Sequence, residues 1–269
     1  MSTPTFPNRI IEIGDPDKAT VTLIQQRLNA VGCGPIDEDG NFDPDTENAV
    51  KLFQSRFFDE KDRPLEVDGQ VGSLTWGVLF GEDTVPSSAI APSALTTAVI
   101  TFATTQIGVL ETMDASGNGL NRGTQVDQYQ IAVGLSLPAS PSAKGFFWCV
   151  AFTYFCYQQA ASGLSITNPH IKTAGVLDHW NKAKTKPGVK RVLSSQAVAN
   201  PSLIKPGALF IINHGGGLGH TGIVTEVKNG RLVTIEGNTN PNGSRNGIGV
   251  FKRDTRKIKD INMGFIDYS

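Results

Sequence analysis

The sequence lacks the features that mark membrane proteins and disulfide-stapled proteins. It has only three cysteines in 269 residues, and an odd, small number in a chain of this length favours reduced thiols over a disulfide framework. No stretch reaches the roughly 18 consecutive apolar residues that a membrane-spanning helix needs. The most apolar stretch, residues 95–110, is interrupted by five threonines and one glutamine. We therefore expect no membrane insertion.

A charge excess and a secretory leader are also missing. Lys and Arg total 24 against 25 Asp and Glu, and no basic cluster is dense enough to suggest a polyanion partner. A near-neutral chain has no long-range attraction for nucleic acid, so we expect no nucleic-acid partner. Residues 1–17 are polar and hold three prolines, without the basic start and the apolar segment of about 7 to 15 residues of a signal peptide. We expect synthesis in the cytoplasm without a signal peptide.

The first third of the chain contains a short internal repeat. Asp39-Gly40 is followed by Thr46 and Asp68-Gly69 by Thr75, so that Thr lies seven residues after Asp in both copies. An Asp-Gly pair favours a tight turn because glycine accepts a positive φ and aspartate bonds its own backbone. Each copy therefore predicts a turn that leads into a helix.

Helical spacing of apolar residues predicts three short helices in this region, with one small shared core. Asp43 and Pro44 suit the N-cap and the first turn of the second helix, and the third begins near Ser73. The apolar residues of the three helices are Val21, Ile24, Leu28 and Val31, then Ala49, Val50, Phe53 and Phe57, then Trp76 and Leu79.

A second domain follows a stretch rich in Pro and Ser. Residues 85–95 have the composition of an interdomain linker, and we place the domains at residues 1–84 and 96–269. The second domain shows helical patterns over residues 95–110, 126–133 and 146–161. Short strand patterns follow at residues 208–212, 220–227, 231–236 and 249–252. Helices followed by strands favour an α+β fold with an antiparallel sheet.

Cys149 is the candidate nucleophile. It begins a helical run, and the free N–H groups and the dipole of a helix N-terminus favour the thiolate, which is the attacking form. The alternative is a small core residue, which is the commonest role of a free cysteine among aromatic residues. Cys156 fits that alternative better. It lies seven residues further on, about 10 Å along a helix, too far for a disulfide with Cys149.

His220 is the candidate base, because a hairpin places it beside polar residues. Lys228-Asn229-Gly230 is a hairpin signal, and a three-residue loop would set Ile223 opposite Ile235 and Thr225 opposite Val233. The other face would then hold His220, Glu236 and Asn238. The glycines around His220 would let a substrate backbone come close.

Together, Cys149, His220 and Glu236 would form a nucleophile, a base and an orienting carboxylate. Alternatively, His220 and Glu236 lie solvated on an ordinary sheet edge. His214, His220 and Glu236 could in principle bind zinc, but the spacing of known zinc motifs is missing. Residues 114–125 resemble a calcium loop only in part, and residues 215–219 lack the lysine of a phosphate loop. We expect no cofactor and no metal.

The N-terminal third resembles a family. Residues 15–81 are similar to the three-helix peptidoglycan-binding domain of bacterial and phage cell-wall enzymes. The resemblance rests on Gln25, Leu28 and Gly32, on Asp39–Phe42 with Thr46, on Ala49-Val50 and Phe53-Gln54, and on Val67–Gly72 with Thr75-Trp76. It implies that the module binds the bacterial cell wall. Asp43-Pro44-Asp45 departs from the glycine that the family usually has after the aromatic residue.

Residues 96–269 resemble the CHAP family of papain-like amidases and peptidases that cut peptidoglycan. The matching blocks are Phe147–Phe152, Lys205–Leu209, Gly219–Val224 and Ile235–Asn240. The resemblance implies an α+β fold in which N-terminal helices pack on an antiparallel sheet. It also implies that Cys149, His220 and Glu236 are catalytic and that Asn238 is a further polar residue of the active site.

We also assign four residues to substrate binding: Trp148, Gly219, Asn121 and Arg122. Glu111 and Asn121-Arg122-Gly123 resemble a segment that precedes the cysteine in similar proteins, although these residues could equally cap a loop.

The two resemblances together imply a peptidoglycan hydrolase that cleaves an amide of stem or cross-link peptides through a thioester. We expect a bacteriolytic enzyme that acts in the periplasm or cell wall, either as a phage endolysin or as an injected antibacterial toxin. A toxin would have an immunity protein or a secretion-system component as a partner. The alternatives are a wall-binding adhesion protein without catalysis and, further behind, a zinc amidase.

Overall fold

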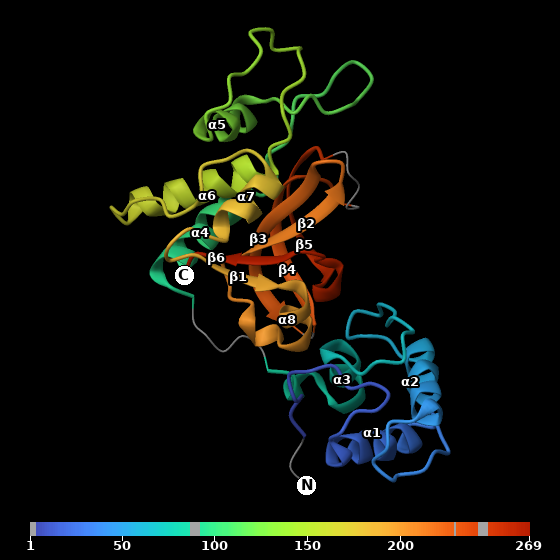
Figure 1. Cartoon of the computed structure of the whole chain (residues 1–269). Helices are drawn as coiled ribbons and strands as arrows, with labels where there is room; N and C mark the ends of the chain where they lie inside the picture. The colour runs from blue at the N-terminus through green and yellow to red at the C-terminus, as the bar shows by residue number, and fades with distance from the viewer. Residues whose placement is uncertain (1–3, 87–91, 229, 242–246) are drawn as a thin grey trace. The chain divides into compact units, whose positions relative to one another are not determined.

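The computed structural model describes residues 4–86, 92–228, 230–241 and 247–269. The chain forms two compact units (Figure 1), one made of Met1–Ser87 with Val198–Ser202 and the other of Ser88–Ala197 with Leu203–Ser269. Each unit has its own apolar core. Of the predicted linker, residues 85–95, positions 87–91 lie outside the described residues. In the described parts, no helix has the length and apolar character needed to cross a membrane.

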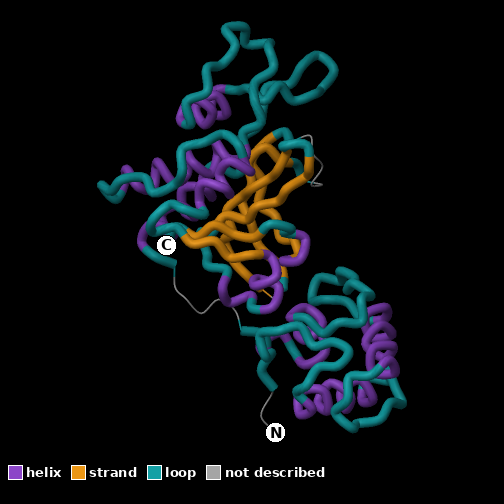
Figure 2. Tube along the Cα trace, in the orientation of Figure 1, coloured by secondary structure: helices purple, strands orange, loops and turns teal. Residues whose placement is uncertain are grey.

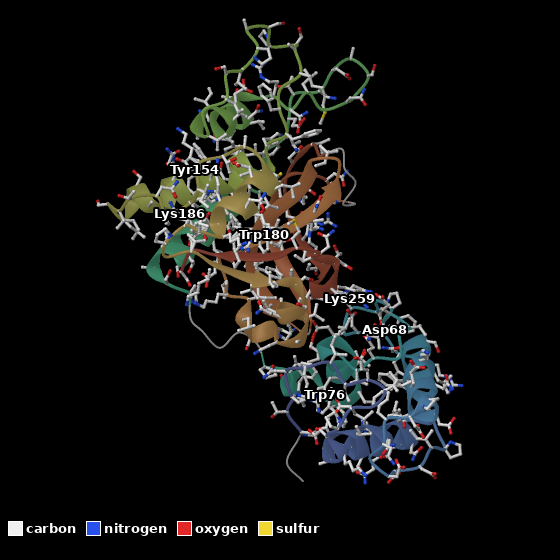
Figure 3. All side chains as sticks on the ribbon, in the orientation of Figure 1. Asp68, Trp76, Tyr154, Trp180, Lys186 and Lys259 are labelled. Atoms are coloured by element: carbon white, nitrogen blue, oxygen red, sulfur yellow. The ribbon has the colours of Figure 1, made fainter. Side chains whose placement is uncertain are left out.

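The first unit contains the three predicted helices. They are α1 (Lys18–Ala30), α2 (Pro44–Arg56) and α3 (Ser73–Phe80), followed by the 3-10 turn η1 (Glu82–Thr84). The Asp43 side chain caps α2 by accepting the backbone N–H of Thr46 at 2.8 Å, as the sequence predicts. The apolar faces of the three helices meet in one core around Phe53 and Trp76. Trp76 is labelled in Figure 3.

In both copies of the internal repeat, a glutamine side chain forms the same hydrogen bonds with the Asp-Gly turn. The Gln25 side chain on α1 accepts the N–H of Gly40 at 2.9 Å, and its amide nitrogen donates to the Asp and Thr of the same turn. Gln54 on α2 makes the equivalent bonds with the second turn, beginning with the N–H of Gly69 at 2.9 Å. Each helix therefore fixes the turn from which the next helix starts.

The second unit is built on a six-stranded antiparallel sheet, which confirms the predicted α+β class (Figure 2). The strands lie in the order β1-β6-β2-β3-β4-β5. Their bounds are β1 (Lys190–Leu193), β2 (Leu209–Gly215), β3 (Leu218–Lys228), β4 (Arg231–Thr239), β5 (Gly249–Lys257) and β6 (Gly264–Asp267). The four-residue strands β1 and β6 are too short to show a pattern in the sequence.

Three helices of this unit bury their apolar residues against the sheet: α4 (Ala94–Thr105), α6 (Cys149–Gly163) and α7 (Val176–Ala183). The remaining helical segments are α5 (Thr124–Ala132), α8 (Ser194–Ala199), η2 (Pro201–Leu203) and η3 (Ile258–Asp260). The sequence predicts α4, α5 and α6 within a few residues but not α7. Helix α6 begins at Cys149 rather than at residue 146.

The β3–β4 hairpin has the predicted register near the candidate site, but its loop is shorter than predicted and β3 contains a bulge. Ile223 lies opposite Ile235, as predicted, yet pairing continues to Lys228 and Arg231, so only two residues separate the strands. A bulge between residues 224 and 226 supplies the extra residue, and Glu226 rather than Thr225 pairs with Val233. The expected three-residue loop is therefore wrong. The apolar pattern predicts which residues pair near the site. It does not show whether the one unpaired residue lies in a longer loop or in a bulge, because both give the same pairing.

Two histidines are buried together behind the sheet of the second unit. The rings of His170 and His179 have centroids 4.4 Å apart, and Nε2 of His179 lies 2.6 Å from the hydroxyl of Tyr268. Burial lowers the pKa of His170 well below its ordinary value and that of His179 to about 3. Both rings are therefore neutral in the folded protein at neutral pH.

The first prediction concerns acid stability. Unfolded histidine takes up a proton as the pH falls below about 6.5, whereas folded His179 does so only near pH 3. The free energy of unfolding should thus fall with pH across this window, by up to about 1.4 kcal/mol per pH unit for this group. His179→Gln should reduce that slope in urea unfolding between pH 7 and pH 5. The exposed His214→Gln is the control, and equal slopes in the two variants would contradict the assignment.

Candidate active site

Cys149 is the first residue of α6, and Trp148 is its N-cap. The sulfur-bearing residue is only 4% exposed. Its backbone N–H belongs to the first turn, where a helix has no acceptor of its own to offer. The sequence signal that placed a cysteine at a helix start is therefore matched by the structure.

His220 lies on β3 and bonds Glu236 directly. Its Nε2 is 2.8 Å from Oε2 of Glu236, and the ring also interacts with the side chain of Cys149. The side chain is 13% exposed. Burial, the largest single influence, acts to lower the pKa of His220. Hydrogen bonds and charge from Cys149 and Glu236 together outweigh it and raise the pKa to about 9.

Glu236 on β4 is completely buried, and four hydrogen bonds satisfy its carboxylate. Besides His220, the Arg256 guanidinium donates to Oε1 at 2.6 Å and to Oε2 at 2.7 Å, and the Thr234 hydroxyl donates to Oε1 at 2.6 Å. Burial is the largest influence and acts to raise the pKa of Glu236. The bonds and charges of Arg256 and His220 outweigh it and hold the pKa below its ordinary value. Glu236 is therefore a carboxylate at neutral pH.

Arg256 is a further residue of the site, which the sequence pattern does not indicate. It lies on β5 beside β4, its guanidinium sits 4.7 Å from the ring centroid of Phe210, and its side chain is 15% exposed. The apolar pattern suggested a strand over residues 249–252 only, whereas β5 runs to Lys257. Recognition of that longer strand would have placed Arg256 on the strand beside β4, but residues 253–257 are all polar and carry no apolar signal.

The glycines around His220 make room for the protein's own groups. A Cβ at Gly222 would lie 2.7 Å from Cγ of Glu236 and 2.9 Å from the ring of Phe210. A Cβ at Gly219 would lie 2.6 Å from the carbonyl oxygen of Ile212. Close packing therefore explains why these two positions are glycine. Substrate contact by Gly219 remains a prediction.

The Trp148 side chain packs inside the second unit, and its assignment to substrate binding stays a prediction. It is fully buried, and its indole N–H donates to Oε1 of Glu111 at 2.8 Å. A Cβ at Gly237 would lie 2.7 Å from the indole ring, so Trp148 packs directly beneath the strand residue after Glu236. The neighbouring Phe146 and Phe147 are 46% and 59% exposed and are the aromatic side chains of this segment that a ligand can reach.

Asn121 and Arg122 organise the loop before α6, and their assignment to substrate binding stays a prediction. The N–H of Asn121 donates to Oε2 of Glu111 at 2.6 Å, and its backbone has a left-handed φ of 51°. The Arg122 guanidinium bonds both carboxylate oxygens of Asp127 and the carbonyl of Ser140. Both residues are buried. Burial raises the pKa of Glu111, the carboxyl group that links this loop to Trp148.

Asn238 lies two residues after Glu236 but does not continue the strand regularly. Its φ is 55°, and the β4–β5 pairing is irregular between residues 236 and 239. Its side chain forms no hydrogen bond with another described residue. An active-site role for Asn238 therefore stays a prediction.

The zinc alternative finds no donor set in the part of the chain that the structure describes. No group of three His, Cys, Asp or Glu residues there could hold a metal ion. His214 is exposed near the end of β2, and the Glu236 oxygens already accept bonds from Arg256, Thr234 and His220.

Comparison with protein families agrees with both resemblances. Residues 17–79 match the family described as a putative peptidoglycan binding domain, and residues 141–238 match the CHAP domain. The chain therefore carries a peptidoglycan-binding domain followed by a CHAP domain. At family level these domains imply cell-wall binding and peptidoglycan hydrolase activity. The chain matches no curated protein and no solved structure in the corresponding comparisons.

The second prediction tests the packing that supports Glu236. In Gly222→Ala, the new methyl group would press on Glu236 and Phe210, and overpacking of this kind costs about 1–3 kcal/mol. We expect a lower free energy of unfolding in urea and a loss of wall hydrolysis. Gly163→Ala is the matched control, because a Cβ there meets no atom within 4 Å. Equal stability and activity of the two variants would refute the close packing.

Proposed function

We propose that the protein hydrolyses an amide bond in the stem or cross-link peptides of peptidoglycan, with Cys149 as the nucleophile. His220 acts as the general acid and base, and Glu236 orients its ring. The observation that carries this proposal is the 2.8 Å bond between His220 and the buried Glu236, together with the influence of the Cys149 side chain on the pKa of His220. Nucleophile, base and orienting group in mutual contact are the recurring arrangement of covalent hydrolysis.

The reaction proceeds in two displacements. Because Nε2 of His220 is bonded to Glu236, the other ring nitrogen, Nδ1, is the one that exchanges a proton with the sulfur. The Cys149 thiolate attacks the carbonyl carbon, and the C–N bond breaks as the imidazolium protonates the leaving amine. Water then attacks the thioester, gives its proton to His220, and the C–S bond breaks to release the acid and the thiolate.

Two features of the fold prepare this chemistry. The raised pKa of His220, about 9, keeps the ring protonated at neutral pH, so that a proton is available for the leaving amine. The backbone N–H of Cys149 at the helix start is a donor for the developing oxyanion. Both depend on the position of α6 against β3 and β4.

The N-terminal domain would hold the enzyme at its insoluble substrate. We assign residues 1–84 to wall binding, residues 85–95 to a linker and residues 96–269 to catalysis. A tethered module raises the local concentration of substrate without taking part in the chemistry. Peptidoglycan is thus the proposed partner of both domains.

We further propose a bacteriolytic role in the periplasm or cell wall, where peptidoglycan is found. A phage endolysin released from the cytoplasm and a toxin injected into rival bacteria both fit this role. For an injected toxin, an immunity protein or a secretion-system component is the expected partner.

The third prediction tests the nucleophile. Cys149→Ala should lower the rate of wall hydrolysis by about 10³-fold or more, because no other group replaces the attacking sulfur. The rate is measured by turbidity loss of purified cell walls. Cys156→Ala is the matched control: this thiol is fully buried, and burial raises its pKa well above the ordinary value. Its activity per folded molecule should be unchanged.

The same assay separates the alternatives. A wall-binding protein without catalysis would leave wall turbidity unchanged even as wild type, and a metal-dependent amidase would lose its activity to a chelator. Full activity of Cys149→Ala would end the proposal.

A further inference from the structure

The near-neutral charge of the chain hides two parts of opposite sign. Residues 1–86 hold 7 Lys and Arg against 16 Asp and Glu, whereas residues 87–269 hold 17 against 9. The catalytic part is therefore strongly basic, and the wall-binding part is strongly acidic. The expectation that no polyanion is attracted, which rested on the whole-chain charge and on a missing basic cluster, does not hold for the catalytic part.

A run of cations without any intervening acidic residue lies where α7 leads into β1. Five cations lie within ten residues there, Lys182, Lys184, Lys186, Lys190 and Arg191, and Lys186 is labelled in Figure 3. Lys182 pairs with Asp178 at 2.7 Å. The other three lysines are exposed and form no ion pair with any described residue. Their charge therefore faces solvent without compensation.

The guanidinium of Arg191 is held in place on this surface by Trp180. Its guanidinium lies 4.3 Å from the ring centroid of Trp180, and Nη1 donates to the Trp180 carbonyl at 3.3 Å. A guanidinium held in this way needs less ordering when it binds an oxyanion. Beside it is a cavity of about 320 Å³, lined by Ala183, Lys184, Val189, Arg191, Leu193 and Gln196.

The same helix connects this surface to the catalytic residues. The first residue of α7, Val176, packs against Gly219 next to His220, and α7 is eight residues long. At 1.5 Å per residue its two ends are about 12 Å apart. A polymer held at the end of α7 would thus lie within a few residues' reach of the catalytic groups.

We propose that Lys184, Lys186, Lys190 and Arg191 form a binding surface for the oxyanions of a cell-wall polymer. This inference rests on the proposed function, since it assumes that the catalytic unit works on the wall. Wall oxyanions come from two sources, the carboxylates of stem peptides and the phosphates of attached polymers. Lysines bind either by charge, and the arginine adds a planar pair of donors.

Single-stranded nucleic acid is a poorer fit. Binding of that kind needs exposed aromatic rings on which bases stack, and Trp180 is buried beneath Arg191 with 6% of its surface exposed.

The test measures binding to cell walls by sedimentation, in full-length protein that carries Cys149→Ala so that the walls stay intact. The patch variant combines Lys184→Gln, Lys186→Gln and Lys190→Gln. The control variant combines Lys144→Gln, Lys172→Gln and Lys252→Gln, three exposed lysines from other segments. Both lose the same charge. Each is assayed on walls with and without their phosphate polymers, on anionic lipid vesicles, and over a range of salt concentrations.

The patch variant should bind walls roughly tenfold more weakly than the control at low ionic strength, with the difference lost at high salt. Loss only on walls that keep their phosphate polymers identifies phosphates, and loss on both preparations identifies carboxylates. Equal binding of the two variants overturns the proposal, as does a larger loss on vesicles than on walls. Because binding is measured without catalysis, failure of this surface is separate from failure of the proposed hydrolysis.

Discussion

The architecture of the catalytic unit depends on one buried carboxylate. Glu236 is fully inaccessible to solvent, and a buried charge without partners would cost several kcal/mol. Arg256 offsets that cost by donating two charge-assisted hydrogen bonds to the carboxylate, and His220 forms a further bond with Oε2. Three strands must therefore lie side by side, β3 with the histidine, β4 with the glutamate and β5 with the arginine. The ionised glutamate in turn helps to keep His220 protonated beside Cys149.

Packing behind this ion network sets where the sulfur lies. Gly222 and Gly237 leave no space for a side chain between the sheet and its neighbours, so Glu236 and the Trp148 indole come close to the strands. Trp148 is the residue before Cys149, and its indole N–H donates to Glu111 in the preceding loop. The start of α6 is thereby fixed from two sides. Residues that resembled substrate contacts in the sequence, Asn121 and Arg122, belong to this support.

The sequence predicts both domains, most helices and the pairing of Ile223 with Ile235 because each leaves an apolar period or a turn signal. It also brings Cys149, His220 and Glu236 into one hypothesis. It misses what leaves no such trace. Arg256 lies on an extension of β5 that consists of polar residues, and the bulge after Val224 replaces a longer loop without changing the register. Burial of Trp148 depends on a loop thirty-seven residues earlier, which no local pattern shows.

The proposed mechanism requires the Cys149 side chain to lie against the imidazole of His220, and the pKa of that ring reports whether it does. Proton NMR of the four histidines, with His220 assigned from a His220→Ala variant, gives its pKa in the wild type and in Cys149→Ala. We expect a value of about 9 in the wild type, to which Cys149 contributes by hydrogen bond and charge. The value should fall clearly when the sulfur is removed. An unchanged pKa would show that the two side chains do not meet.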